Sequence, residues 1–83
     1  MVLPDKPVTL SAQEIADLNS KLSAMRHDIN NNLSLIMAGV ELVRLKPETL
    51  NRMVATLSEQ PAKISGTMTN FSTEFEKALG IKR

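Results

Sequence analysis

Apolar residues recur at helical spacing through the first half of the chain. The segment SAQE places Ser11 three residues before Glu14, which is the spacing of a capping box at a helix start. Five of the apolar residues that follow lie seven positions apart, namely Ile15, Leu22, Ile29, Ile36 and Val43. This pattern predicts one continuous helix with a narrow apolar seam, from about Ala12 to Leu45.

A proline ends this first helix. Pro47, in the segment LKPE, disfavours helical conformation in the residue before it and suits the first position of a new helix. Apolar residues then return at helical spacing as far as Leu79, just before Gly80, a residue type favoured at helix C-caps. The pattern predicts a second helix over about Glu48–Leu79, with a kink or a short break at Pro61.

The short connection between the two helices predicts an all-α fold, an antiparallel two-helix hairpin. The apolar stripe of the first helix widens after Ile29, and a wide stripe requires more than one neighbouring helix. The residues that widen it are Leu33, Leu35, Val40 and Leu42. We therefore expect the hairpin to form a homodimer, a four-helix bundle with twofold symmetry. Residues 1–10, which contain two prolines, are expected to form an extended arm before the hairpin domain of residues 11–83.

The composition narrows the classes of partner and site. The 83 residues include a single histidine and no cysteine. The absence of cysteine excludes disulfides and thiolate metal sites. Ten basic and nine acidic residues give a net charge of +1, so we expect neither a nucleic-acid nor a membrane partner. No apolar run approaches the roughly 18 residues of a membrane span, and the N-terminus does not resemble a signal peptide. A soluble cytoplasmic protein is expected.

A polar cluster, HDINNN, interrupts the apolar pattern near the middle of the first predicted helix. Asp and Asn are poor helix formers because their side chains compete for the backbone. His27 falls on the side away from the seam and is predicted to be exposed, with Asp28 beside it and Asn31 one turn further on. A solvated surface would explain most of the cluster, and Asn32 on the seam could fix the register of a bundle. Neither explains why so many poor helix formers adjoin the histidine.

The segment HDINNNLSLI resembles the phosphoacceptor motif, or H-box, of histidine-kinase dimerisation domains. In that family a His-Asp or His-Glu pair, with Asn or Thr four residues after the His, precedes an apolar run. A long first helix with the motif, a short turn and a second helix extend the resemblance over most of the chain. The segment NFSTEF, Asn70 to Phe75, is similar to a Phe-Ser segment common late in the family's second helix.

The resemblance implies a role for each of three residues. His27 matches the phosphoacceptor, whose imidazole attacks a phosphoryl group. Asp28 matches the acidic residue that orients the ring or takes its other proton. Asn31 matches the polar residue that, in many members, positions water to hydrolyse the phosphoryl group of a response regulator.

One feature of the family is missing. Its kinases carry an ATP-binding domain after the helical pair, and here the glycines stand alone, without a Gly-rich loop. We therefore expect no cofactor or metal on this chain, with ATP and Mg²⁺ bound only by partner proteins. Whether the chain acts as an enzyme stays open. The initial Met1 and the C-terminal tail favour a complete small protein over a fragment.

Three hypotheses follow. In the first, the chain is a histidine phosphotransfer module of a two-component system, which accepts a phosphoryl group on His27 from a kinase and exchanges it with a receiver-domain aspartate. In the second, it is a catalytically inert dimeric scaffold that binds a kinase or receiver domain. In the third, it promotes dephosphorylation through Asn31 without forming phosphohistidine. Joint presence of His27, Asp28 and Asn31 favours the first.

Overall fold

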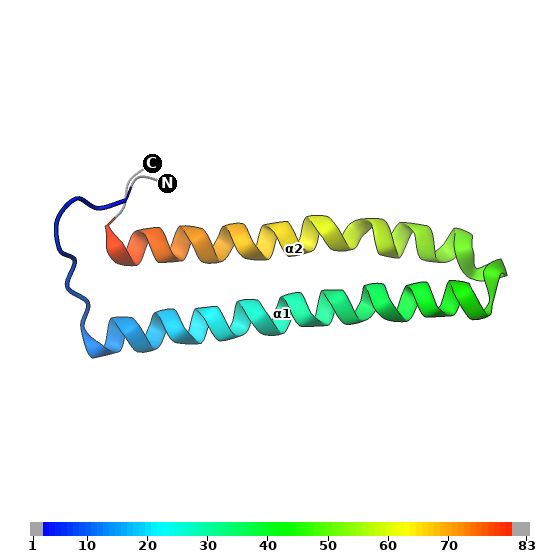
Figure 1. Ribbon diagram of the computed structural model, residues 1–83, viewed down its shortest axis with the longest axis horizontal. Coiled ribbons are helices and arrows are strands. Elements are labelled where there is room, and N and C mark those ends of the chain that lie inside the picture. Colours follow the sequence, from blue (N-terminus) through cyan, green and yellow to red (C-terminus); the bar gives the residue numbers. More distant parts are fainter. Residues whose placement is uncertain (1–2, 81–83) are drawn as a thin grey trace.

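Two long antiparallel helices make up the fold (Figure 1). The computed structural model describes residues 3–80. Helix α1 spans Ala12–Leu45 and helix α2 spans Leu50–Leu79, and a short 3-10 turn, η1, covers Pro47–Thr49 between them. The chain is elongated, with extents of 57 × 24 × 13 Å. The predicted all-α helical hairpin is confirmed, including both ends of α1.

Both outer ends of the hairpin have the predicted caps. At the start of α1, the Glu14 N–H donates to Ser11 Oγ at 3.1 Å, and the Ser11 N–H donates to Glu14 Oε1 at 3.0 Å. This reciprocal pair is the capping box expected from the sequence. At the end of α2, Gly80 adopts the left-handed region with φ of 69° and donates its N–H to the carbonyls of the preceding turn. A glycine takes this conformation without steric cost.

The second helix begins later than predicted. We expected it to start at about Glu48, but residues 47–49 form η1 and α2 begins at Leu50. Thr49 explains the tighter turn, because its hydroxyl donates to the Lys46 carbonyl at 2.8 Å and its N–H donates to the same oxygen at 2.9 Å. Both bonds span three residues, as in a 3-10 helix, and together they reverse the chain within a few residues.

Pro61 does not interrupt α2, so the short break that the sequence allowed does not occur. Proline has no N–H to donate to the carbonyl four residues earlier, which weakens a helix at that point. In the turn before it, the buried Gln60 side chain donates its amide to the Thr56 carbonyl at 3.0 Å. Beyond the proline, half-buried residues such as Ile64 continue to face α1 and hold the second half of the helix in place.

The seam between the helices has the same spacing on both sides. Sixteen helical residues with reduced exposure recur alternately every four and every three positions, which is the pattern of a coiled coil, while Leu42, Ser72, Phe75, Glu76 and Leu79 have reduced exposure outside this pattern. On α1 they are Leu18, Leu22, Met25, Ile29, Asn32, Ile36, Gly39 and Val43. On α2 they are Met53, Leu57, Gln60, Ile64, Thr67, Phe71, Glu74 and Ala78. Four of these sixteen residues are polar, so the seam contains polar as well as apolar residues.

Two contacts fix the register of the seam. Lys21 Nζ lies 2.8 Å from Glu74 Oε2 near the open end of the hairpin. Toward the turn, a Cβ built on Gly39 would lie only 2.7 Å from Leu57 Cδ2, so the helices approach closely there. This register carries Ile15 past the end of α2, which explains why Ile15 is 55% exposed although it continues the predicted apolar seam.

The two edges of the hairpin differ in chemistry. Among the described residues, no apolar side chain is fully buried. Residues that directly follow a seam position lie along one edge, which we call the apolar edge: Leu33 and Val40 on α1, and Val54 and Met68 on α2, with exposed fractions between 44% and 54%. Residues that directly precede a seam position lie along the opposite edge, which we call the polar edge; they include Asp28, Lys63 and Asn70 and, toward the turn, the apolar Leu35 and Leu42.

The buried Gly39 of α1 and the exposed Gly66 of α2 provide a matched test of the close approach. Gly66→Ala should raise the free energy of unfolding by about 1 kcal/mol, because a Cβ there meets nothing within 4 Å and alanine is the better helix former. Gly39→Ala should raise the free energy of unfolding less than Gly66→Ala does, because the Leu57 side chain must move to make room for the Cβ. Thermal melts at one protein concentration measure the difference. Equal stabilisation by the two substitutions would contradict the register.

Candidate functional site

His27, Asp28 and Asn31 lie together near the middle of α1. The His27 side chain is 75% exposed and the Asp28 side chain is 62% exposed. The predicted exposure of His27 is therefore confirmed. Its position follows from the seam, since His27 lies two residues before the seam residue Ile29 and falls on the far side of the helix from α2. Asn32, as the sequence suggested, is half-buried on the seam.

One ring nitrogen of His27 is the point where the three side chains meet. Asn31 Nδ2 lies 3.4 Å from His27 Nδ1, within hydrogen-bonding reach. Asp28 Oδ1 lies 3.8 Å from the same Nδ1, which is too long for a hydrogen bond but within reach of an ion pair if the ring is protonated. The structure therefore brings all three predicted residues together around Nδ1.

A groove on the polar edge joins two of these residues to α2. It has a volume of about 440 Å³, and Asp28 and Asn31 form part of its α1 wall. The other residues that line it are Asn32, Lys63, Gly66, Thr67 and Asn70. His27 does not line this groove, so the imidazole lies outside it while its two neighbours face it. Every side chain in the wall is polar, and Lys63 is its one cation among the described residues.

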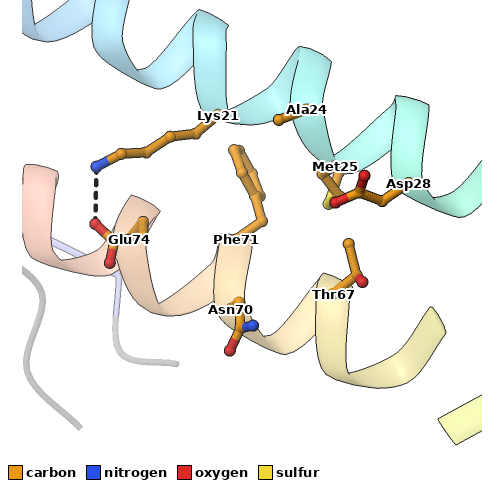
Figure 2. A pocket seen from close by; sticks show the side chains of 8 residues that line it. All are labelled: Lys21, Ala24, Met25, Asp28, Thr67, Asn70, Phe71 and Glu74. Carbon is orange, nitrogen blue, oxygen red and sulfur yellow. Dashed lines mark hydrogen bonds and ion pairs between the residues drawn. The ribbon is translucent and has the colours of Figure 1, made fainter. Parts of the chain in front are cut away.

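A second groove continues the first toward the open end of the hairpin (Figure 2). It has a volume of about 320 Å³ and shares Asp28, Thr67 and Asn70 with the first. Figure 2 shows the Phe71 ring reaching from α2 toward α1, beside Met25, and the ion pair between Lys21 and Glu74 beyond it. The two grooves together form a continuous depression along the polar edge, with an apolar floor at this end.

Several of these groove residues were not predicted from the sequence. Lys63 and Thr67 are polar residues of the second helix that carry no motif of their own, and Asn70 begins the segment NFSTEF without a role assigned to it. A signal was nevertheless present, because Gln60, Thr67 and Glu74 are spaced seven apart, in step with the seam. In the segment NFSTEF, Phe71 contributes to the groove and its ring lies 6.2 Å from that of Phe75, in a tilted aromatic pair.

The described part of the chain offers no other chemical centre of this kind. Within residues 3–80, no three side chains of the His, Asp or Glu type gather closely enough to hold a metal ion. Neither described helix combines the length and the apolar character that crossing a membrane requires. Comparison of the chain with protein-family models, with curated proteins and with solved structures finds no match.

The electrostatics of the groove are clearest at its open end. The hydrogen bond from Lys21 lowers the pKa of the Glu74 carboxyl below its ordinary value of 4.5, and the same bond raises the pKa of Lys21. Because the folded pKa of Glu74 lies below the unfolded one, the stability that this carboxylate contributes is present above pH 4.5. It is lost as the pH falls through the lowered folded value.

Glu74→Gln should therefore remove part of the acid sensitivity of the fold. We expect the wild type to be slightly more stable than the variant at pH 7, and this difference to be smaller at pH 3, which lies below the ordinary pKa of the carboxyl, 4.5. Urea unfolding at both pH values measures it. Glu59→Gln is the control, because its ion-pair partner, Lys63, lies on the same helix. A difference that persists unchanged at pH 3 would contradict a role for the carboxylate charge.

Proposed function

We propose that the chain is a histidine phosphotransfer module that works as a homodimer. It accepts a phosphoryl group on His27 and exchanges it with an aspartate of a receiver domain. The observation that carries this proposal is the arrangement around His27: an exposed imidazole, with Asp28 and Asn31 both beside Nδ1, on a rigid helix next to an open groove. The likeness of HDINNNLSLI to the H-box supports the same assignment.

The exposure of the site suits a reaction completed by a partner. Phosphoryl transfer depends mainly on positioning and on charge stabilisation, and little covalent chemistry is required of the protein. The described chain supplies a nucleophile with one adjacent carboxylate and one adjacent amide. The metal ion and the positive charge would then come from the kinase or receiver domain that closes over His27.

The apolar edge supports the homodimer. An isolated hairpin leaves Leu33, Val40, Val54 and Met68 about half exposed, and none of the described apolar side chains is fully buried. Both helices contribute to this edge, so two hairpins related by a twofold axis could cover it reciprocally as a four-helix bundle. The polar edge, with its grooves, would remain accessible in such a dimer. His27 would remain accessible too, because it lies off the seam.

Phosphorylation of His27 can be tested without a partner. Incubation with potassium phosphoramidate, a small phosphoryl donor, should label the wild type in an acid-labile and base-stable form, detected by phosphorus NMR. His27→Gln should abolish the label and leave the helical content unchanged, because the side chain is exposed. The labelled protein should then pass the group to an isolated receiver domain.

A folded wild type that takes no label from phosphoramidate or from a phosphorylated receiver would instead favour the inert scaffold. In that case His27→Gln should bind its partner as well as the wild type does. If Asn31→Ala slowed the dephosphorylation of a receiver while no phosphohistidine formed, the chain would be a phosphatase helper.

The dimer can be tested on the apolar edge without disturbing the seam. Light scattering should give the wild type twice the chain mass of 9.1 kDa. Val40→Asp should shift the mass toward the monomer, because a charge buried in the interface lacks a partner. The control is Ser34→Asp, which adds the same charge to an exposed position of the same helix away from this edge. A monomeric wild type, or equal effects of both variants, would refute the assignment.

A further inference from the structure

Gln60 is the most deeply buried polar residue in the described part of the chain, with an exposed fraction of 2%. Its amide nitrogen donates to the Thr56 carbonyl at 3.0 Å, a bond that stays within α2. Its amide oxygen, Oε1, is buried and has no hydrogen-bond partner among the described residues. A buried acceptor without a donor destabilises the folded state, and an apolar side chain of similar volume would avoid that cost. Packing alone therefore does not explain a glutamine at this seam position.

The next residue leaves a second acceptor without its usual donor. Pro61 has no N–H, so the Leu57 carbonyl, four residues earlier, cannot receive the regular hydrogen bond of an α-helix. Close by, the Ser58 hydroxyl donates to the Ala55 carbonyl at 3.1 Å. Bonds of this kind, from a side chain to the carbonyls of its own helix, weaken and bend helices. We call residues 55–61, which contain all of these features, the hinge segment.

The rest of the fold holds α2 on both sides of the hinge segment. Toward the turn, the Thr49 hydroxyl and N–H both donate to the Lys46 carbonyl. Toward the open end, Lys21 pairs with Glu74 at 2.8 Å. A helix that is held at both ends and lacks regular hydrogen bonds between them bends most easily in its middle.

We infer that the hinge segment lets α2 bend without unfolding of the hairpin, so that the part of α2 beyond Pro61 moves relative to α1. This movement affects the groove of about 440 Å³ on the polar edge, because Lys63 lines it from α2 and Asn31 lines it from α1. Helix α1 contains no proline and keeps its wall of the groove in place. Bending of α2 therefore changes the width of the groove. The inference is independent of the chemistry proposed for His27.

Bending also provides hydrogen bonds that the straight helix lacks. In the straight form, Gln60 Oε1 is shut off from water and the Leu57 carbonyl has no regular helical donor. When α2 bends away from α1, water reaches both oxygens and donates to them. These hydrogen bonds offset part of the seam contacts that are lost. The bent form is therefore closer in free energy to the straight form than it would be with an apolar residue at position 60 and an N–H at position 61.

Amide hydrogen exchange of the full chain tests the hinge, when it is read residue by residue by NMR at one protein concentration. The amides of residues 59, 60 and 62–64, which we call the hinge amides, should exchange about tenfold faster than those of residues 69–73. Their rates should change little in low concentrations of urea, because bending exposes little surface. The rates of residues 69–73 should rise steeply with urea, because these amides are released only when the hairpin unfolds.

Two substitutions should suppress the bending. Gln60→Leu removes the acceptor that has no partner, and Pro61→Ala supplies the missing N–H. Each should slow exchange of the hinge amides by about tenfold. Thr67→Val is the control, because it makes a polar-to-apolar change at a half-buried seam position two turns away. It should slow the amides of residues 69–73, through the stability of the whole hairpin, and leave the hinge amides unchanged.

Three results would overturn the hinge. In the first, the wild-type hinge amides exchange as slowly as those of residues 69–73, or respond to urea as steeply, so that α2 opens only with the whole hairpin. In the second, neither Gln60→Leu nor Pro61→Ala slows the hinge amides. In the third, Thr67→Val slows the hinge amides as much as those two substitutions do. Labelling of His27 by phosphoramidate tests the proposed function separately, and none of these results changes its outcome.

Discussion

Along the seam between α1 and α2, each helix contributes one residue at every third or fourth position. The packing of these residues determines which face of each helix points away from the other helix. Gly39 lets the helices approach closely beside Leu57, and the ion pair between Lys21 and Glu74 fixes the register at the other end. Two helices can bury only the stripes along which they touch. The polar residues on this seam, such as Gln60 and Thr67, limit how much apolar surface even those stripes remove from water.

This geometry explains why the candidate site is held so loosely. His27 lies on the side of α1 away from the seam, and its side chain is 75% exposed. Its neighbours come from its own helix: Asp28 from the next position and Asn31 from the next turn. A site made from one exposed helical turn cannot exclude water or stabilise developing charge by itself. In the proposed function it presents a nucleophile to a partner, and the partner supplies the closed environment.

The periodicity of the sequence was sufficient to predict what depends on local rules. The bounds of α1, the capping box at Ser11 and the glycine cap at Gly80 follow from propensity and spacing, and the structure agrees with them. The later start of α2 was not predicted, because it depends on two hydrogen bonds from Thr49 to one carbonyl. The exposure of Ile15 was not predicted either, because it depends on where the partner helix ends.

The residues of the candidate site likewise divide into those that local rules predict and those that depend on the packing of the two helices. His27, Asp28 and Asn31 are neighbours in sequence on one helix, so helical spacing alone brought them together. Lys63, Thr67 and Asn70 join them only through the register of α2, which the sequence pattern does not specify.

The same register gives the hairpin two edges that carry different kinds of side chain. Exposed apolar residues such as Leu33 and Val54 directly follow seam positions, while polar residues such as Asp28 and Lys63 directly precede them. In an antiparallel pair, equivalent positions of both helices lie on the same edge. Toward the turn, Leu35 and Leu42 add apolar residues to the polar edge. The apolar edge, with its exposed apolar side chains, therefore lies opposite the polar edge, which carries the grooves. Self-association through the apolar edge would leave the polar edge, with the residues beside His27, free to bind a different protein.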